Sequence, residues 1–216
     1  MKVIALVVGQ LQTNCYLVID AASNECLIID PGDDADLIMQ KIQDGSLKPV
    51  GIVATHGHFD HCLGVLELKL AYGIPFCLHK NDLPILKRMP SSARHFLGIE
   101  VGPPTPVDHF LKAGDNLSFG KESLEIIETF GHTPGGISLY SRPNQVVFVG
   151  DTLFAQGGVG RTDFSYADEI TLKQSISKLL KLPADTIVYT GHGEATTIGE
   201  ERRFHPCGNN AVKMRK

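Results

Sequence analysis

Three histidines and an aspartate lie within six positions of one another, directly after an apolar run. The segment reads His56-Gly-His58-Phe-Asp60-His61, and residues 51–54 before it have the composition of a buried strand. His56 and His58 are two positions apart, so an extended loop lets both chelate one metal ion. Asp60 and His61 are expected to open the next helix and point elsewhere, which suits a second ion. Imidazole and carboxylate ligands fit Zn²⁺, Fe²⁺ or Mn²⁺.

Three later segments repeat this arrangement, each with one His or Asp just past an expected strand. His132 follows residues 124–130, Asp151 follows 146–149 and His192 follows 186–190. Glycines beside each of them permit a close approach of the backbone. Each residue taken alone is as easily structural as functional. Together with the first segment they supply the remaining ligands of a two-metal site.

Short β-branched and aromatic runs bounded by turn residues indicate the strands that position these ligands. They are residues 3–8, 15–20, 26–30, 50–54, 75–78, 124–130, 137–141, 146–149 and 186–190. The close spacing of the first three predicts antiparallel hairpins.

Helical patterns alternate with these strands. They cover 33 or 34 to 43, 60–72 and 165–182. The apolar faces expected for them are Leu37, Ile38 and Ile42; Leu63, Leu66 and Leu70; and Ile170, Leu172, Ile176, Leu179 and Leu180. Strands mixed with helices predict a layered α/β architecture.

Composition excludes several other classes of protein. With 43% hydrophobic and 20% charged residues, the 216-residue chain is an ordinary globular protein. A net charge of −4 offers no basic field to gather nucleic acid. No apolar stretch approaches the roughly 20 residues that span a bilayer, and residues 3–8 resemble a strand more than a signal peptide. An odd number of cysteines, five, favours a reducing compartment, so we expect a cytoplasmic protein.

The order of four motifs identifies a family resemblance. T-H-x-H-x-D-H at 55–61, G-H-T-P-G at 131–135, G-D-T-L-F at 150–154 and G-H-G at 191–193 resemble the metallo-β-lactamase superfamily. The chain is most similar to the short relatives of glyoxalase II (hydroxyacylglutathione hydrolase), also at residues 11–16, 158–164 and 195–202. The resemblance covers nearly the whole chain. It implies one domain over residues 1–216, an αββα sandwich of two mixed β-sheets flanked by helices, with two metals at one edge.

The resemblance also implies the role of each ligand. His56, His58 and His132 would bind the first metal, Asp60, His61 and His192 the second, and Asp151 would bridge them. Two divalent ions are implied, Zn²⁺ first, with iron or manganese as alternatives. Asp30 resembles an aspartate that steadies the metal loop, although a turn residue is an equal reading.

The implied activity is hydrolysis of a small-molecule thioester of the S-acylglutathione type by a metal-bridging hydroxide. A thiolate of conjugate pKa near ~8.5 leaves with little help from an acid. Asp60 is the one candidate for proton transfer. The identities of the acyl group, of the metals in the cell and of the oligomer stay open.

The match with full-length glyoxalase II weakens where that enzyme holds its substrate. After His192 only a short tail remains, so we expect its added C-terminal helical region to be absent. Arg161, Arg202 and Arg203 are candidate anion contacts, with a solvated or structural arginine as the alternative for each. Phe164 stands where a hydrogen-bonding Tyr would be.

Three other functions compete with the hydrolase. Residues 160–164 are also similar to the persulfide dioxygenase branch, which uses one Fe²⁺ held by His, His and Asp. Nuclease or β-lactamase activity is a second alternative. A non-catalytic, metal-stabilised binding protein is the third.

Overall fold

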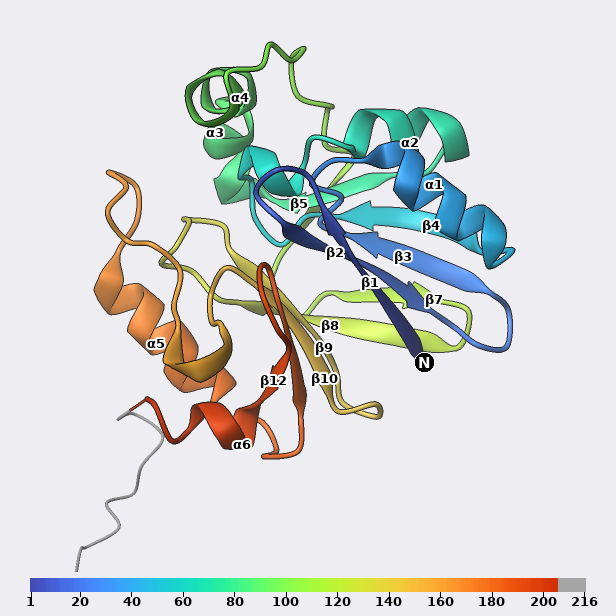
Figure 1. The fold of residues 1–216 in the computed structure, drawn as a ribbon. Helices are drawn as coiled ribbons and strands as arrows, with labels where there is room; N and C mark the ends of the chain where they lie inside the picture. Colours follow the sequence, from blue (N-terminus) through green and yellow to red (C-terminus); the bar gives the residue numbers. More distant parts are fainter. Residues whose placement is uncertain (206–216) are drawn as a thin grey trace, which may run out of the picture.

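Two β-sheets face each other (Figure 1). Buried apolar side chains fill the space between them. The structure is a computed structural model, and it describes residues 1–205. Within that range, the strands of the first sheet are, in order, β1 (Lys2–Val8), β2 (Thr13–Ile19), β3 (Glu25–Ile29), β4 (Lys48–Val53), β5 (Phe76–His79) and β6 (His109–Leu111). Those of the second are β7 (Asn116–Phe119), β8 (Glu122–Glu128), β9 (Ile137–Ser141), β10 (Val146–Gly150), β11 (Ile187–Thr190) and β12 (Thr196–Thr197).

Both sheets are mixed. Strands β1, β2 and β3 pair antiparallel, as the predicted hairpins require, and β3 to β6 pair parallel. In the second sheet β7 to β10 are antiparallel, β10 and β11 are parallel, and β12 is antiparallel to β11. Each strand order follows the chain, so each sheet is built from one continuous stretch of sequence.

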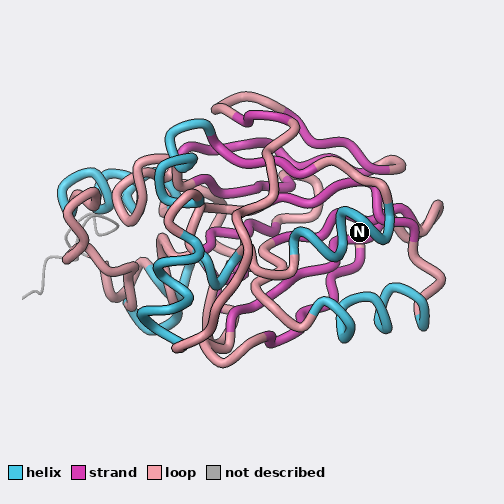
Figure 2. The backbone as a smooth tube through the Cα atoms, turned by 90° about the horizontal axis from the view of Figure 1, so that it is seen from above, coloured by secondary structure: helices cyan, strands magenta, loops and turns pink. Residues whose placement is uncertain are grey.

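Helices cover the outer faces of the two sheets. Helices α1 (Ala35–Asp44) and α2 (Val65–Tyr72) pack on the first sheet, and α5 (Glu169–Leu179) and α6 (Ile198–Glu201) pack on the second. Figure 2 shows the strands running through the middle with helices around them. The remaining helices are α3 (Leu83–Leu86) and α4 (Met89–Leu97), with 3₁₀ turns η1 (Phe59–His61), η2 (Lys80–Asp82) and η3 (Ala155–Gly157). The predicted αββα sandwich is confirmed.

Both faces of the central strands are buried. Successive side chains of a strand point to opposite faces, one towards the helices and the other towards the second sheet. On β2, Leu17 contacts the helices of the first sheet, whereas Tyr16 and Val18 lie between the sheets. On β10, Val147 packs under α5 and Phe148 packs between the sheets. A strand buried on both faces is a continuous apolar run, and such a run was the signal that predicted it.

All nine predicted strands overlap observed ones, but three short strands were missed. They are β6, β7 and β12, each at an edge of its sheet. An edge strand is partly exposed, so it needs no apolar run; β6, for example, has two exposed residues and one buried residue.

The helix predictions need correction. The predicted helix over 60–72 is broken: Asp60 and His61 lie in η1, and α2 begins only at Val65. Gly64 interrupts it, because the Gly64 amide donates to the Pro31 carbonyl (2.9 Å) and a Cβ there would lie 3.1 Å from that oxygen.

The apolar faces were also partly wrong. On α2, Val65 and Leu68 are buried, whereas Leu66 and Leu70 are exposed. The side chains of Leu37 on α1 and Ile170 on α5 are exposed too. Helix α5 begins at Glu169, because the Asp168 carboxylate accepts from the Thr171 amide and caps it there.

Two observations bear on the predicted environment of the chain. Cys15, Cys26, Cys62 and Cys77 are free and buried, and Cys207 lies outside the described residues. Among the described residues, no helix has both the length and the apolar character to cross a membrane.

Candidate metal centre

Loops at one edge of the sandwich carry all seven predicted ligands. His56 and His58 follow β4, and Asp60 and His61 lie in η1 just beyond. The other three follow strands of the second sheet: His132 follows β8, Asp151 follows β10 and His192 follows β11. Both sheets therefore contribute to the same site.

The structure brings these side chains together as two groups. One group is His56, His58, His132 and Asp151, and the other is Asp60, His61 and His192. In the first, His58 Nδ1 lies 3.0 Å from His56 Nε2 and 3.1 Å from His132 Nε2.

Asp151 reaches both groups. Its Oδ2 is 3.7 Å from His132 Nε2 and 3.7 Å from His192 Nε2, and its Oδ1 is 3.5 Å from His61 Nε2. Asp60 Oδ2 closes the second group, 3.4 Å from His192 Nε2 and 3.8 Å from His61 Nε2. The carboxylate of Asp151 thus lies between the two groups and within 4 Å of both.

Glycines make this approach possible, as the sequence predicted. A Cβ at Gly191 would lie 2.0 Å from Asp151 Oδ1. Gly150 has φ +52°, and a Cβ there would lie 2.2 Å from Thr55 Oγ1. Any larger residue at either position would push the loops after β10 and β11 out of the site.

The outward ring nitrogens fix the tautomers of two histidines directly. His132 Nδ1 lies 2.8 Å from the Arg161 carbonyl, and His192 Nδ1 lies 3.2 Å from the Gln12 carbonyl. A carbonyl only accepts, so each Nδ1 carries the proton and each Nε2 turns a lone pair inward.

Asp30 and Tyr166 orient the other three histidines. Asp30 accepts from the Thr55 amide (2.6 Å) and from Thr55 Oγ1 (2.7 Å), and lies 3.0 Å from His61 Nδ1. Because the Thr55 hydroxyl proton goes to Asp30, its oxygen is free to accept from His56 Nδ1 (3.1 Å). Tyr166 Oη lies 2.8 Å from His58 Nε2, which leaves Nδ1 inward. Such partners orient metal-binding histidines. Asp30 therefore does more than shape a turn.

Charge in the site is consistent with bound cations. Burial lowers the pKa of His56 well below its usual range, and burial with His132 lowers that of His58 to about 3, so both rings are neutral. Burial alone would lower the pKa of His61, but Asp151, Asp30 and Asp60 outweigh it and raise it to about 10. The carboxylates thus draw positive charge into the centre.

Orphaned polar atoms give a second test of the fit to a metal. His61 Nε2 and Asp151 Oδ1 are buried and have no hydrogen-bond partner among the described residues. Such atoms are unfavourable unless something binds them. A pair of divalent cations at the two groups would satisfy both, so the residues present fit the predicted metals.

No motif pointed to Asp82, which ties the metal loops together. Its buried carboxylate accepts from the Gly57 amide (2.8 Å), the Gly135 amide (2.5 Å) and Thr133 Oγ1 (2.8 Å). Burial raises the pKa of Asp82, and these hydrogen bonds oppose the rise. Only the fold brings the loops after β4 and β8 to the same residue.

Residues of the β1–β2 hairpin anchor the loop that carries His192. Asn14 Nδ2 donates to the carbonyls of Thr190 (3.1 Å) and Gly193 (2.9 Å). Tyr16 Oη donates to the Thr190 carbonyl as well (2.6 Å). The similarity of residues 11–16 to the glyoxalase II relatives flagged this segment without indicating its contact.

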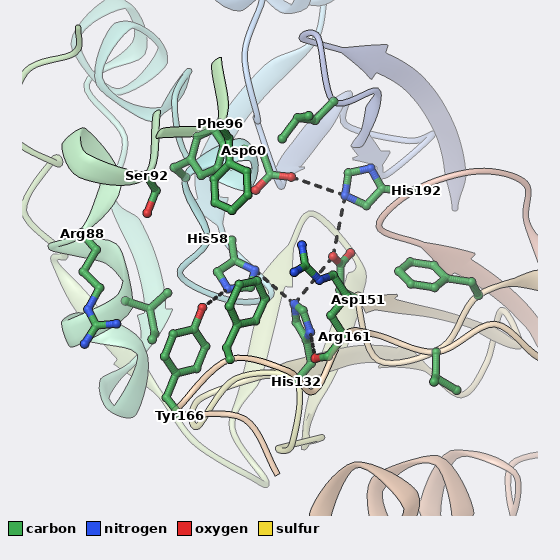
Figure 3. Close-up of a pocket in the computed structure, with 16 residues that line it drawn as sticks. His58, Asp60, Arg88, Ser92, Phe96, His132, Asp151, Arg161, Tyr166 and His192 are labelled. Carbon is green, nitrogen blue, oxygen red and sulfur yellow. Dashed lines mark hydrogen bonds and ion pairs between the residues drawn. The ribbon is translucent and has the colours of Figure 1, made fainter. Parts of the chain in front are cut away.

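A pocket of roughly 520 Å³ opens over the metal centre (Figure 3). His58, Asp60, His132, Asp151 and His192 reach it. The rest of its wall is Leu11, Phe59, Ile85, Arg88, Ser92, Phe96, Phe154, Val159, Arg161, Phe164 and Tyr166. Helix α4 forms one side of the pocket.

Of the other candidate residues, one lines the pocket and the rest lie outside it. Arg161 lines the pocket, but Asp163 pairs with its guanidinium at 2.9 and 2.7 Å. Arg202 donates to the carbonyls of Leu180 and Leu182, so it is structural, and Arg203 is exposed and does not line the pocket. Cys62 is a buried core residue.

The sequence matches the model of a known protein family. The family model described as "Metallo-beta-lactamase superfamily" matches residues 8–192. The chain is 37% identical to hydroxyacylglutathione hydrolase GloC of Haemophilus influenzae over 97% of this chain and 99% of that one. It is 39% identical to the probable metallo-hydrolase YqgX of Bacillus subtilis over 94% and 95%.

Solved structures agree on the fold and differ in described chemistry. BLEG-1, described as a B3 metallo-beta-lactamase, superimposes with a TM-score of 0.88 at 34% identity, covering 97% of this chain and 100% of that one. TTHA1623 in a di-iron-bound form gives 0.85 at 38%, covering 94% and 98%. ETHE1 from Myxococcus xanthus gives 0.79 at 26%, covering 95% and 84%.

Proposed function

Since the chain belongs to the metallo-β-lactamase superfamily, we propose that it is a binuclear metallohydrolase that cleaves thioesters of the S-acylglutathione type. The observation that carries the proposal is the pair of ligand groups joined by Asp151. His56, His58 and His132 would hold one ion, Asp60, His61 and His192 the other, and Asp151 both. The likeness to the hydrolase GloC over nearly the full length supports the substrate class.

Divalent cations in these groups, Zn²⁺ or iron, would polarise a carbonyl and acidify a water molecule. The protein's own part is to hold five imidazoles with their lone pairs inward and to keep Asp60 ionised. Burial raises the pKa of Asp60, but His61 and His192 outweigh it and lower the pKa below its usual range. Asp60 lines the pocket, so it can accept a hydrogen bond from the attacking water.

The ionised state of Asp60 favours a thioester as the substrate. Asp60 lines the pocket as a carboxylate, so it has no proton to donate to a poor leaving group. In thioester hydrolysis the water oxygen bonds to the carbonyl carbon, the C–S bond breaks, and the sulfur leaves as a thiolate. A thiolate is stable near neutral pH without a donor.

The test is a metal count and a thioester assay on one purified sample. We expect two metals per chain and release of free thiol from S-lactoylglutathione. His61→Ala should lose one of the two metals and most of the activity. His109 is an exposed histidine on β6, and His109→Ala should keep both metals and the activity. A sample with two metals that leaves the thioester intact would contradict the proposal.

A mononuclear-iron persulfide dioxygenase is the second candidate. The likeness to ETHE1 and the segment 160–164 support it, whereas the complete Asp60–His61–His192 group supports the hydrolase. One iron per chain, with oxygen uptake on a glutathione persulfide, would establish it in place of the hydrolase. The likeness to BLEG-1 makes a cephalosporin the third substrate to assay.

A further inference from the structure

One face of the α3–α4 segment points at the pocket and plays no part in the chemistry proposed above. Its members are three, four and four positions apart, the spacing of a single helical face. They are Ile85, Arg88, Ser92 and Phe96. Met89 and Ala93, on the other side of α4, are buried in the core of the first sheet. The helix is thus anchored by one face and presents the other to whatever enters the pocket.

Apolar side chains are exposed around the pocket mouth. Phe96 is 47% exposed, although its ring stacks on Phe59 with centroids 5.8 Å apart. Leu11 (39% exposed) and Val159 (44%) also line the pocket, from two other loops. Exposed apolar residues from separate segments that gather around one cavity indicate a ligand surface.

Arg88 is the cation on this face whose guanidinium N–H donors are available to a ligand. Its guanidinium lies 5.6 Å from the centre of the Tyr166 ring, and no carboxylate of the described residues pairs with it. Arg161 differs, because Asp163 occupies its guanidinium with two hydrogen bonds. A guanidinium with free donors matches a carboxylate, which it can bind through two parallel hydrogen bonds.

Tyr166 sets the distance between Arg88 and the metal centre. Its hydroxyl is 2.8 Å from His58 Nε2, and its ring lies beneath the Arg88 guanidinium (Figure 3). A ligand held at both ends would therefore span about the length of one aromatic side chain.

We propose that this face selects thioesters in which an apolar segment separates the thioester from a carboxylate. Arg88 binds the carboxylate, and Phe96, Leu11 and Val159 cover the apolar segment. The inference rests on the proposed function, because it takes the metal centre as the place of the thioester. The carboxylate can belong to the acyl half or to the thiol half of the substrate.

Two matched pairs of thioesters test this selectivity and identify which half of the substrate carries the carboxylate. In the acyl pair, N-acetylcysteamine carries a 3-phenylpropionyl group with or without a para carboxylate. In the thiol pair, 3-phenylpropionyl is joined to 3-mercaptopropionate or to N-acetylcysteamine. We expect the charged member of one pair to have a roughly tenfold higher kcat/KM, which corresponds to about 1.4 kcal/mol.

Variants test which residues cause the preference for the charged thioester. Arg88→Met should remove it by raising KM for the charged member, with kcat and the neutral member unchanged. Lys87→Met, the neighbouring exposed cation outside the pocket, should keep it. Phe96→Ala should lower kcat/KM for both members roughly tenfold, whereas Phe110→Ala, equally exposed on β6, should not. A preference that survives Arg88→Met would overturn the inference.

A binding measurement separates this inference from the proposed function. Thioether analogues of the same pairs cannot be hydrolysed, and calorimetry on the metal-loaded protein gives their affinities. Arg88-dependent binding of the charged thioether without hydrolysis of any thioester would overturn the proposed function and leave the ligand class standing. Hydrolysis with no charge preference in either pair would overturn the inference alone.

Discussion

Each histidine of the metal centre has one ring nitrogen occupied by a neighbour, and that contact decides which nitrogen faces inward. The neighbours are diverse: backbone carbonyls for His132 and His192, a hydroxyl for His56, a carboxylate for His61 and a phenol for His58. Among the side chains that make these contacts, Tyr166 is the one that also lines the pocket. Removing it should therefore alter both the metal and the cavity.

Tyr166→Phe is expected to weaken metal binding at the His56–His58–His132 group about tenfold, since lost partners of ligating histidines have effects of this size. Competition with a chromogenic chelator measures the affinity. Tyr72→Phe on α2 is the control, because that ring lies on the core side of the first sheet. Unchanged affinity in Tyr166→Phe would show that the hydroxyl does not orient His58.

The sequence predicted the ligands and, through the family resemblance, Asp30, but it did not indicate Tyr166 or Asp82. His56 to His61 are recognisable because four ligand types crowd into one turn after an apolar run. Tyr166 and Asp82 carry no such local pattern. Tyr166 meets a histidine 108 positions away, and Asp82 meets amides 25 and 53 positions away. Those contacts exist only after the loops have come together.

Among the elements, the β1–β2 hairpin has a role beyond its place in the sheet. It joins the second sheet at the metal centre, where the Asn14 amide nitrogen donates to the Gly191 carbonyl and the Asn14 side chain holds the loop on both sides of His192. The loop that carries His192 is therefore positioned by a strand of the opposite sheet.

Asn14→Ala should lower the affinity of the Asp60–His61–His192 group for metal and lower stability by about 1–3 kcal/mol, because buried carbonyls lose their donors. Metal titration and thermal unfolding measure the two effects. Asn144→Ala is a matched control, since Asn144 Nδ2 also donates two hydrogen bonds but lies in the β9–β10 turn. It should lose stability and keep its metal affinity. Equal metal affinities in both variants would contradict the role given to Asn14.

Elements were predictable in proportion to how fully they are buried. Central strands such as β2 and β10 are apolar on both faces, and their runs were unmistakable. The missed edge strands β6, β7 and β12 and the α3–α4 segment are partly exposed, so their apolar patterns were weak. On α2 the apolar residues were seen but their face was wrong, because the break at Gly64 resets the register of the helix.

At the scale of the whole molecule, the metal centre lies across the seam between the sheets. His56, His58, Asp60 and His61 come from the first sheet's half of the chain, and the other three ligands come from the second. The sandwich was predicted through the family resemblance. The pocket was not, because its walls come from loops and from α4, whose packing no local pattern encodes.

Metal removal should destabilise the protein, and more so at higher pH. Free metal at about a hundred times its Kd contributes about 2.7 kcal/mol, or on the order of 5–10 °C in Tm. In the metal-free protein the raised pKa of His61 stabilises the fold fully below about 6.5, and this contribution is lost as pH rises towards about 10. Metal binding needs neutral imidazoles, so its contribution grows over the same range.

Thermal unfolding with and without a chelator at pH 6 and pH 9 measures this difference. We expect the gap in Tm to be larger at pH 9. A gap that narrows as pH rises would show that His61 is not a ligand.

The sequential order of the strands has a consequence for how the molecule can be divided. Strands β1 to β6 end at Leu111 and β7 begins at Asn116, so one short connection, residues 112–115, separates two complete sheets. A chain cut there yields two fragments, each with its own sheet and an incomplete set of ligands. Their reassociation would bury the apolar surface between the sheets and restore both ion sites at once. Metal ions would then control complementation between the fragments, and a protein that binds metal to do chemistry would become a metal-dependent switch.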